Sequence, residues 1–174
     1  MMKIALITGA SSGLGREFAR QIPKLYQNLD EIWVVARRAE RLNELEMELK
    51  VPVRIFDGDL NQDYIYKKLG IALGKSHANV RMLVNAAGYG KIGTFCEYGW
   101  KEETGMVDLN CRSLTKNDST FASVYALWQQ NCEPFHQLQH LDHSLDLQCM
   151  QRQNLTFTAC PWHLAENLKE AVFM

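Results

Sequence analysis

Hydrophobic and polar positions follow two alternating patterns along the first two-thirds of the chain. Short apolar runs of strand type lie at residues 3–7, 32–36, 51–56 and 80–84. Each run is followed by a stretch with apolar residues at helical spacing, in the order 16–22, 39–49, 64–73 and from about residue 100 onward. This alternation of strand and helix predicts an α/β fold with a parallel, doubly wound sheet. In such a sheet, ligands bind beyond the carboxyl ends of the strands.

A glycine-rich turn joins the first predicted strand to the first predicted helix. It reads Thr8-Gly9-Ala10-Ser11-Ser12-Gly13-Leu14-Gly15. A turn of this kind leaves backbone N–H groups beside the positive end of a helix dipole, which suits a pyrophosphate. Gly9 allows the tight turn, Gly13 lets a phosphate approach the backbone, and Gly15 lets the helix pack close to the strand. The alternative is that small residues merely fill the turn.

The spacing Gly-x-x-x-Gly-x-Gly resembles the short-chain dehydrogenase/reductase family, and later motifs extend the resemblance to about residues 3–116. Asn85-Ala86-Ala87-Gly88 resembles the family's Asn-Asn-Ala-Gly motif. Asn110 matches the helix asparagine that holds a water for the proton relay, one of four catalytic residues. The resemblance implies a Rossmann-type fold with this cofactor-binding set: Thr8, Gly9, Ser11, Ser12, Gly13, Leu14, Gly15, Arg37, Arg38, Asp59, Leu60, Asn85, Ala86, Ala87 and Gly88.

The end of the second predicted strand bears on the choice between NAD and NADP. An acidic residue there binds the adenosine 2′-hydroxyl, whereas an arginine accommodates a 2′-phosphate. The sequence reads Ala36-Arg37-Arg38, with no acid before Glu40, so it favours NADP over NAD. The alternative is that both arginines are solvated residues at a helix start.

Two further motifs follow the third predicted strand. In the resembled family, an Asp-Leu pair there borders the adenine, and Asp59-Leu60 takes that position. An aspartate also suits a turn and a helix N-cap. Tyr64 and Lys68 form Tyr-x-x-x-Lys, but they lie in an early crossover helix and are rejected as the family's catalytic pair.

The character of the sequence changes at Asn117. Glutamine and histidine become frequent, and no buried strand run follows. The resembled family would need three more strands, a catalytic serine and a Tyr-x-x-x-Lys motif here, and the chain has none of these. We therefore predict a dinucleotide-binding domain over 1–116, truncated at about four strands, and an irregular or helical tail over 117–174. The implied activity, hydride transfer between NADP and a small-molecule carbonyl or alcohol, is predicted to be incomplete and inactive.

A shifted reading frame would explain the tail. Dropping one base at codon 117 permits a methionine codon in place of Asn117 and then a helix end and a strand. A second slip near Phe135 permits a serine pair followed by Tyr-Ala-Ala-Thr-Lys, which resembles the missing catalytic segment. We therefore hypothesise that the tail is translated out of frame.

Two other interpretations of the tail stay open. Cys132, His136, His140 and His143 lie at helical spacings and have the chemistry of a zinc site, but they match no common structural zinc pattern, so no metal is predicted. Alternatively, the chain is a non-catalytic dinucleotide-binding module. Its interaction surface would then be formed by Trp128, Trp162, Leu164 and Leu168.

Composition and net charge limit the classes of partner that we expect the chain to bind. The net charge is −1 and the pI is about 6.5, which argues against nucleic acid and anionic membranes. No apolar run approaches the roughly 20 residues of a membrane helix. Met1-Met2-Lys3 leads directly into the first predicted strand, so we expect no signal peptide and a cytoplasmic location, with the five cysteines reduced. Members of the resembled family are often dimers or tetramers, so the resemblance implies a homo-oligomer that this tail makes less favourable.

Overall fold

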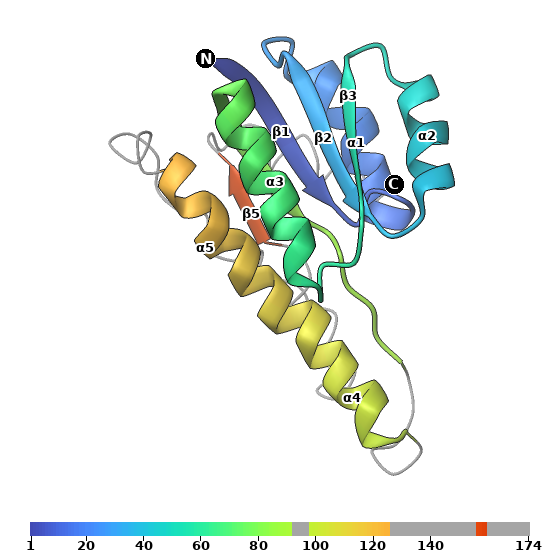
Figure 1. The fold of residues 1–174 in the computed structure, drawn as a ribbon. Helices are drawn as coiled ribbons and strands as arrows, with labels where there is room; N and C mark the ends of the chain where they lie inside the picture. Colours follow the sequence, from blue (N-terminus) through green and yellow to red (C-terminus); the bar gives the residue numbers. More distant parts are fainter. Residues whose placement is uncertain (92–97, 126–155, 160–174) are drawn as a thin grey trace, which may run out of the picture.

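A five-stranded sheet in the order β3-β2-β1-β4-β5 organises the molecule (Figure 1). The computed structural model describes residues 1–91, 98–125 and 156–159. The strands are β1 (Met2–Thr8), β2 (Glu31–Ala36), β3 (Val53–Asp57), β4 (Ala78–Asn85) and β5 (Thr156–Ala159). The helical elements are α1 (Gly13–Leu25), α2 (Ala39–Glu48), α3 (Asp63–Ser76), α4 (Trp100–Val107), the π-helix η1 (Asp108–Ser113) and α5 (Leu114–Tyr125).

The first four strands confirm the predicted parallel, doubly wound sheet. β1 pairs in parallel with β2 on one side and with β4 on the other, and β2 pairs in parallel with β3. The strand order therefore reverses at β1, and the last residue of β1, Thr8, lies in register with Val35 and Asn85. This alignment brings the ends of β1, β2 and β4 together at the edge where an open α/β sheet binds its ligands.

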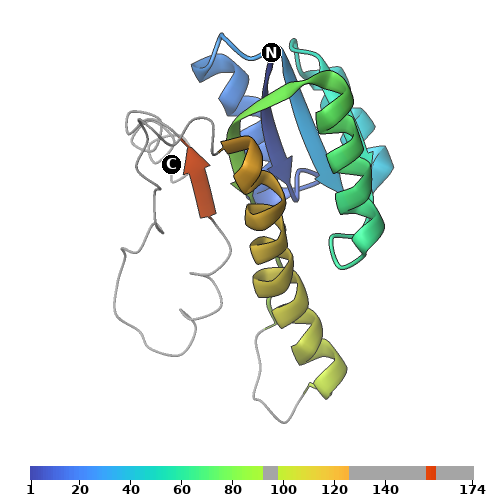
Figure 2. The same cartoon turned by 60° about the vertical axis from the view of Figure 1, so that its left-hand side comes forward.

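Helices cover both faces of the sheet, with α1 and α2 on one face and α3 and α5 on the other (Figure 2). Phe18 and Ile22 of α1 and Leu42 of α2 pack on the first face. Leu69 of α3 and Phe121 of α5 pack on the second. Because both faces are covered, the central strands are buried on both sides, which explains why their sequences are continuous apolar runs rather than alternating ones.

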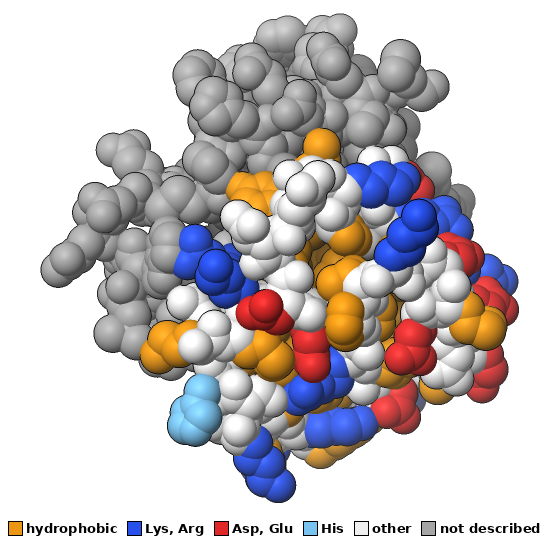
Figure 3. All heavy atoms as spheres, turned by 90° about the horizontal axis from the view of Figure 1, so that it is seen from above, with side chains coloured by type: hydrophobic (Ala, Val, Ile, Leu, Met, Phe, Trp, Pro, Cys, Tyr) orange, Lys and Arg blue, Asp and Glu red, His pale blue; other side chains and the backbone are white. Residues whose placement is uncertain are grey.

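The surface at the amino ends of the parallel strands, away from the ligand-binding edge, carries charges of both signs. Figure 3 views the molecule from that end, and lysine and arginine side chains lie among aspartate and glutamate side chains there. Interspersed charges of both signs form no broad single-sign field of the kind that attracts a polyanion. Among the described residues, no helix is both long enough and apolar enough to span a membrane.

The sequence predicts that Gly74 closes the helix of the 64–73 stretch, but α3 ends two residues later. It extends to Ser76, and His77 caps it in the left-handed conformation with φ 45°. The His77 N–H donates to the carbonyl of Gly74 at 3.3 Å, so the glycine supplies an acceptor for the cap instead of adopting the left-handed turn itself.

The elements α4, η1 and α5 form one continuous helix, as predicted from residue 100 onward (Figure 1). This helix continues past residue 116, where the sequence predicted the domain to end. Its buried residues recur on the side that faces the sheet: Met106, Asn110, Ser113, Asn117 and Phe121. The division of the chain at residue 116 stays a prediction.

One short strand forms within the predicted irregular or helical tail. β5 pairs antiparallel with β4, from Met82 opposite Ala159 to Asn85 opposite Thr156. Its threonines and phenylalanine favour extended backbone, but four residues are too few for a recognisable strand pattern. The proposed metal cluster (Cys132, His136, His140 and His143) and the proposed interaction surface (Trp128, Trp162, Leu164 and Leu168) lie outside the described residues.

Candidate functional site

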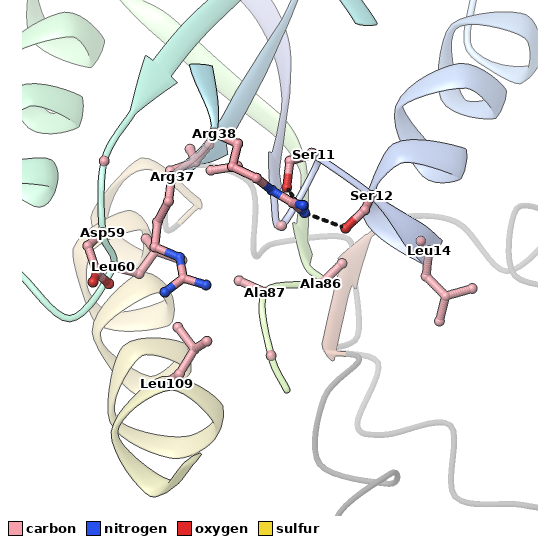
Figure 4. Close-up of a pocket in the computed structure, with 16 residues that line it drawn as sticks. Ser11, Ser12, Leu14, Arg37, Arg38, Asp59, Leu60, Ala86, Ala87 and Leu109 are labelled. Carbon is pink, nitrogen blue, oxygen red and sulfur yellow. Dashed lines mark hydrogen bonds between the residues drawn. The ribbon is translucent and has the colours of Figure 1, made fainter. Parts of the chain in front are cut away.

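A pocket of about 670 Å³ opens at the carboxyl ends of β1, β2, β3 and β4 (Figure 4). It is lined by the turn after β1, the ends of β2 and β3, the segment after β4, and one residue of η1. The lining residues are Gly9, Ser11, Ser12, Gly13, Leu14, Val35, Ala36, Arg37, Arg38, Gly58, Asp59, Leu60, Ala86, Ala87, Gly88 and Leu109. All the predicted cofactor-binding residues except Thr8, Gly15 and Asn85 are among them.

Glycine is required at two positions of the turn by close backbone contacts. Gly9 has φ +70°, and a Cβ there would lie 2.5 Å from the carbonyl oxygen of Ala86, at the end of β4. A Cβ on Gly15 would lie 2.5 Å from the carbonyl oxygen of Gly9. Gly15 therefore packs the start of α1 against the turn itself without lining the pocket, and the two contacts hold β1, α1 and the segment after β4 together.

The start of α1 offers free N–H groups to the pocket. The first-turn N–H groups of a helix have no partner within the helix. The N-cap residue Ser12 makes no side-chain capping bond, and no acidic residue lies in the first turn, whereas Glu40 and Asp63 lie in the first turns of α2 and α3. Gly13, with φ +56°, faces open space. The positive end of the α1 dipole is thus left to an external anion.

The two arginines after β2 differ in their hydrogen-bond partners. The Arg38 Nη2 atom donates to the hydroxyls of Ser11 and Ser12, at 3.0 and 2.9 Å, and so ties the end of β2 to the turn. Figure 4 shows the Arg37 guanidinium in the pocket, between Asp59 and Ala87. Within the described part of the chain, Arg37 makes no hydrogen bond or ion pair. The Arg37 guanidinium is therefore available to bind an anionic group of a ligand.

The segment after β3 forms the wall of the pocket opposite the turn after β1 (Figure 4). The Asp59 carboxylate accepts from the backbone N–H of Asn61 at 2.9 Å, as in a turn that leads into a helix. The Asp59 N–H donates to the Tyr64 hydroxyl at 3.3 Å, and Lys68 pairs with Asp57 at 2.8 Å. The Lys68 ammonium holds the pKa of Asp57 below its ordinary value. The rejected Tyr64–Lys68 pair therefore supports this wall.

Thr8 and Asn85 shape the pocket from behind. The Thr8 hydroxyl donates to the carbonyl of Val84 at 3.4 Å and accepts from the N–H of Ala87 at 3.3 Å. The side-chain Oδ1 of Asn85 accepts from the side-chain Nδ2 of Asn117 at 2.8 Å, and both side chains are buried. These bonds fix the backbone that carries Ala87 along the pocket.

Asn110 holds the segment that follows the pocket wall. Its Oδ1 accepts from the N–H of Tyr89 at 3.1 Å, and its Nδ2 donates to the carbonyl of Tyr89 at 2.9 Å. Asn110 is buried and lies in the π-helix, a conformation frequent at functional sites. Both polar atoms of the side chain are thus engaged with one residue of backbone. The catalytic role of Asn110 stays a prediction.

Four lining residues lie outside the predicted set. Val35, Ala36 and Gly58 line the pocket because β2 and β3 end there, and the sequence pattern predicts them only as strand or turn residues. Leu109 reaches the pocket from η1. Its position beside Asn110 was the available signal, since a motif residue in a helix places its neighbours near the same site.

Comparison with known proteins agrees with this geometry. The family model for short chain dehydrogenases matches residues 3–124. The chain belongs to the short chain dehydrogenase family. The match extends beyond the residue 116 expected from sequence motifs and includes nearly all of α5. The family's nicotinamide dinucleotide chemistry accounts for a glycine-rich turn that opens on a pocket at the end of the sheet.

Individual proteins resemble the chain over part of its length. A very-long-chain 3-oxoacyl-CoA reductase of Aspergillus terreus is 36% identical over 116 residues, which cover 62% of this chain and 31% of that protein. An uncharacterized oxidoreductase of Staphylococcus epidermidis is 29% identical over 110 residues, covering 63% of this chain and 46% of that protein. A short-chain dehydrogenase from Sphingobium yanoikuyae in complex with NADPH is 26% identical with a TM-score of 0.60, covering 73% of this chain and 50% of that one. The chain thus spans half or less of the length of these relatives.

Proposed function

We propose that the chain binds NADP in this pocket as a short chain dehydrogenase domain over residues 1–116, and that it does not turn over a substrate. The observation that carries the cofactor proposal is the Arg37 guanidinium inside the pocket, which has no partner among the described residues. Arg38 is already engaged with Ser11 and Ser12, so Arg37 is the residue available to a 2′-phosphate. The short-chain dehydrogenase from Sphingobium yanoikuyae, which is 26% identical, forms a complex with NADPH, and this supports the same choice.

The other lining residues fit the remaining parts of a dinucleotide. The start of α1 would hold the pyrophosphate on its N–H groups, because it lacks an acidic residue and faces open space at Gly13. Asp59 and Leu60 would border the adenine, and Ala86, Ala87 and Gly88 would line the path toward the nicotinamide. The cofactor, when bound, supplies hydride transfer to or from a carbon atom.

Turnover needs residues that this chain does not contain after residue 116. In the family, a tyrosine transfers the proton, a lysine lowers the tyrosine pKa and holds the ribose, and a serine positions the carbonyl. No Tyr-x-x-x-Lys follows Asn117, because Gln129 stands four residues after Tyr125. Without the tyrosine and lysine, a bound carbonyl oxygen has no positioned proton donor. We therefore expect cofactor binding and no catalytic cycle.

A buried polar side chain supports a shifted frame as the origin of the tail. Asn117, the first residue of the proposed shift, is 1% exposed, and its Oδ1 has no hydrogen-bond partner among the described residues. Burying an unpaired amide oxygen costs about 1–3 kcal/mol. The alternative frame permits an apolar methionine there. Resequencing the gene across codons 114 to 136 tests this: an uninterrupted frame would remove the hypothesis.

The function is tested by binding and turnover on the same preparation. NADPH fluorescence is titrated with the 174-residue chain, and NADPH consumption is then followed with a panel of ketones and aldehydes. We expect saturable binding and no consumption above the protein-free rate. Absence of binding would contradict the cofactor proposal, and carbonyl-dependent NADPH oxidation would contradict the proposed inactivity.

A further inference from the structure

Three buried polar residues recur on one face of the continuous helix 100–125. Asn110, Ser113 and Asn117 are 6%, 2% and 1% exposed. Their spacing places them on the same side as the apolar Met106 and Phe121. Buried polar groups in a helix face require partners, because an unpaired one is costly. Each of the three contacts a segment at the carboxyl edge of the sheet, and Ser113 is the one that meets the wall after β3.

The Ser113 hydroxyl lies in a cluster of oxygen atoms. Its Oγ is 3.1 Å from the carbonyl oxygen of Leu60, 3.0 Å from Oδ1 of Asn61 and 3.0 Å from the carbonyl oxygen of Asp108. A serine hydroxyl has one proton, which it donates to one of these acceptors at a time. The hydroxyl thus joins η1 to the backbone of Leu60, a residue that lines the pocket.

A second hydroxyl holds the same carbonyl. Tyr66 of α3 donates to the carbonyl of Leu60 at 2.9 Å, and its Oη lies 3.3 Å from the carbonyl oxygen of Ser113. Burial raises the pKa of Tyr66, so the phenol keeps its proton and donates throughout the neutral range. The Leu60 carbonyl oxygen therefore lies within hydrogen-bonding distance of two hydroxyls, one from α3 and one from η1, and its two lone pairs can accept from both.

The π-helix makes this contact possible. Asp108 and Ser113 are five residues apart, the spacing of hydrogen bonds in a π turn, and the Ser113 hydroxyl reaches the Asp108 carbonyl. Each residue of an α-helix turns the next side chain by about 100°, so the wider turn changes which side chains face the sheet. Leu109, within the same turn, also lines the pocket, near Leu60 (Figure 4). The segment η1 thus supplies both a pocket-lining residue, Leu109, and the hydroxyl of Ser113, which bonds the backbone of Leu60.

We propose that Ser113 is a positioning residue that fixes the Leu60 wall against Leu109 and so sets the affinity of the pocket for the adenosine end of the dinucleotide. The proposal rests on the proposed function, because it takes Asp59 and Leu60 to border the adenine. Ser113 itself does not line the pocket, so it acts through the backbone of Leu60.

The test compares Ser113→Ala with Thr115→Ala in the whole chain, by titration with 2′,5′-ADP. Thr115 is a matched control because its exposed hydroxyl also bonds a backbone carbonyl on the same helix, that of Cys111 at 3.0 Å, away from the pocket. Loss of one positioning hydrogen bond is expected to weaken 2′,5′-ADP binding about fivefold in Ser113→Ala. Thr115→Ala is expected to bind like the unmodified chain.

A second ligand separates positioning from general loosening. Inorganic pyrophosphate probes the start of α1 and does not reach Leu60. We expect its affinity to be unchanged in Ser113→Ala, whereas a loosened domain would lose affinity for both ligands, which would overturn the proposal. If Ser113→Ala fails to fold, Ser113→Cys keeps nearly the same volume with a weaker donor and is expected to weaken 2′,5′-ADP binding alone.

The outcomes for the proposed function and for Ser113 are distinct. If the unmodified chain does not bind 2′,5′-ADP, both proposals are wrong. If it binds and the folded Ser113 variant binds equally well, only the role of Ser113 is overturned. In the double variant with Tyr66→Phe, the losses should be non-additive, since both hydroxyls hold the same carbonyl.

Discussion

The two sides of the pocket are built by different means. The turn between β1 and α1 is built from backbone, with Gly9 and Gly15 allowing contacts that any Cβ would prevent. The side supplied by η1 is built from buried polar side chains, with Asn110 and Ser113 bonded to the backbone of Tyr89 and Leu60. The first kind leaves a strong sequence motif, because only glycine is tolerated. The second leaves single polar residues in a helix, which sequence alone does not distinguish from surface positions.

Because of this difference, we expect a substitution in the turn to have the largest effect on folding and on cofactor binding. Gly9→Val would place a branched side chain at φ +70° and against the Ala86 backbone, which cannot move as a flexible side chain can. Strain at this φ costs about 1–2 kcal/mol before the backbone clash is counted. We expect loss of cooperative thermal unfolding and of NADPH binding, measured by circular dichroism and fluorescence.

Gly70→Ala is the matched control for the turn glycines. Gly70 lies inside α3, and a Cβ there meets nothing within 4 Å. Alanine should raise the free energy of unfolding by about 1 kcal/mol through helix propensity. A Gly9 variant as stable as the unmodified chain would show that the close contact of the turn with Ala86 does not constrain the fold.

The next largest effect is expected at the free arginine. Arg37→Ala should weaken NADPH binding about tenfold or more, the scale of a lost charge-assisted hydrogen bond, and leave NADH binding nearly unchanged. Arg41→Ala, an exposed arginine of α2 outside the pocket lining, is the control. Equal losses for NADPH and NADH would contradict a specific role for Arg37 at the 2′-phosphate.

The side chains of η1 should give a graded loss. Asn110→Ala removes both hydrogen bonds to Tyr89 and should lower the free energy of unfolding by about 1–2 kcal/mol. The measurement is urea denaturation, with Thr115→Ala as the control on the same helix. A variant as stable as the unmodified chain would mean that the Tyr89 backbone finds equivalent partners in water.

The smallest effect concerns the contact of α1 with α2. Hydrogen bonds from Arg16 and Arg20 lower the pKa of Glu48. A carboxylate with a lowered pKa in the folded chain stabilises it above the pKa of the unfolded chain, and this stabilisation is lost as the pH falls through the folded value. Glu48→Gln should therefore be slightly less stable at neutral pH and equal below the folded pKa. A stability difference that persists in acid would contradict this account.

The alternation of strands and helices could be predicted from the sequence. The apolar runs became β1 to β4 because both faces of the sheet are covered, and the glycine spacing located the turn. The Gly74 stop was missed because His77 took the left-handed cap, and β5 was missed because four residues carry too little pattern. Ser113 could not be identified as a contact of the pocket wall, since that role depends on a π turn, which residue types do not predict.

The central claim is tested most directly by isothermal titration of the 174-residue chain with NADPH and with NADH at matched ionic strength. We expect one saturable site for NADPH, with NADH bound about tenfold or more weakly because its ribose lacks the phosphate that Arg37 would bind. No heat of binding with either dinucleotide, or equal affinity for the two, would contradict it.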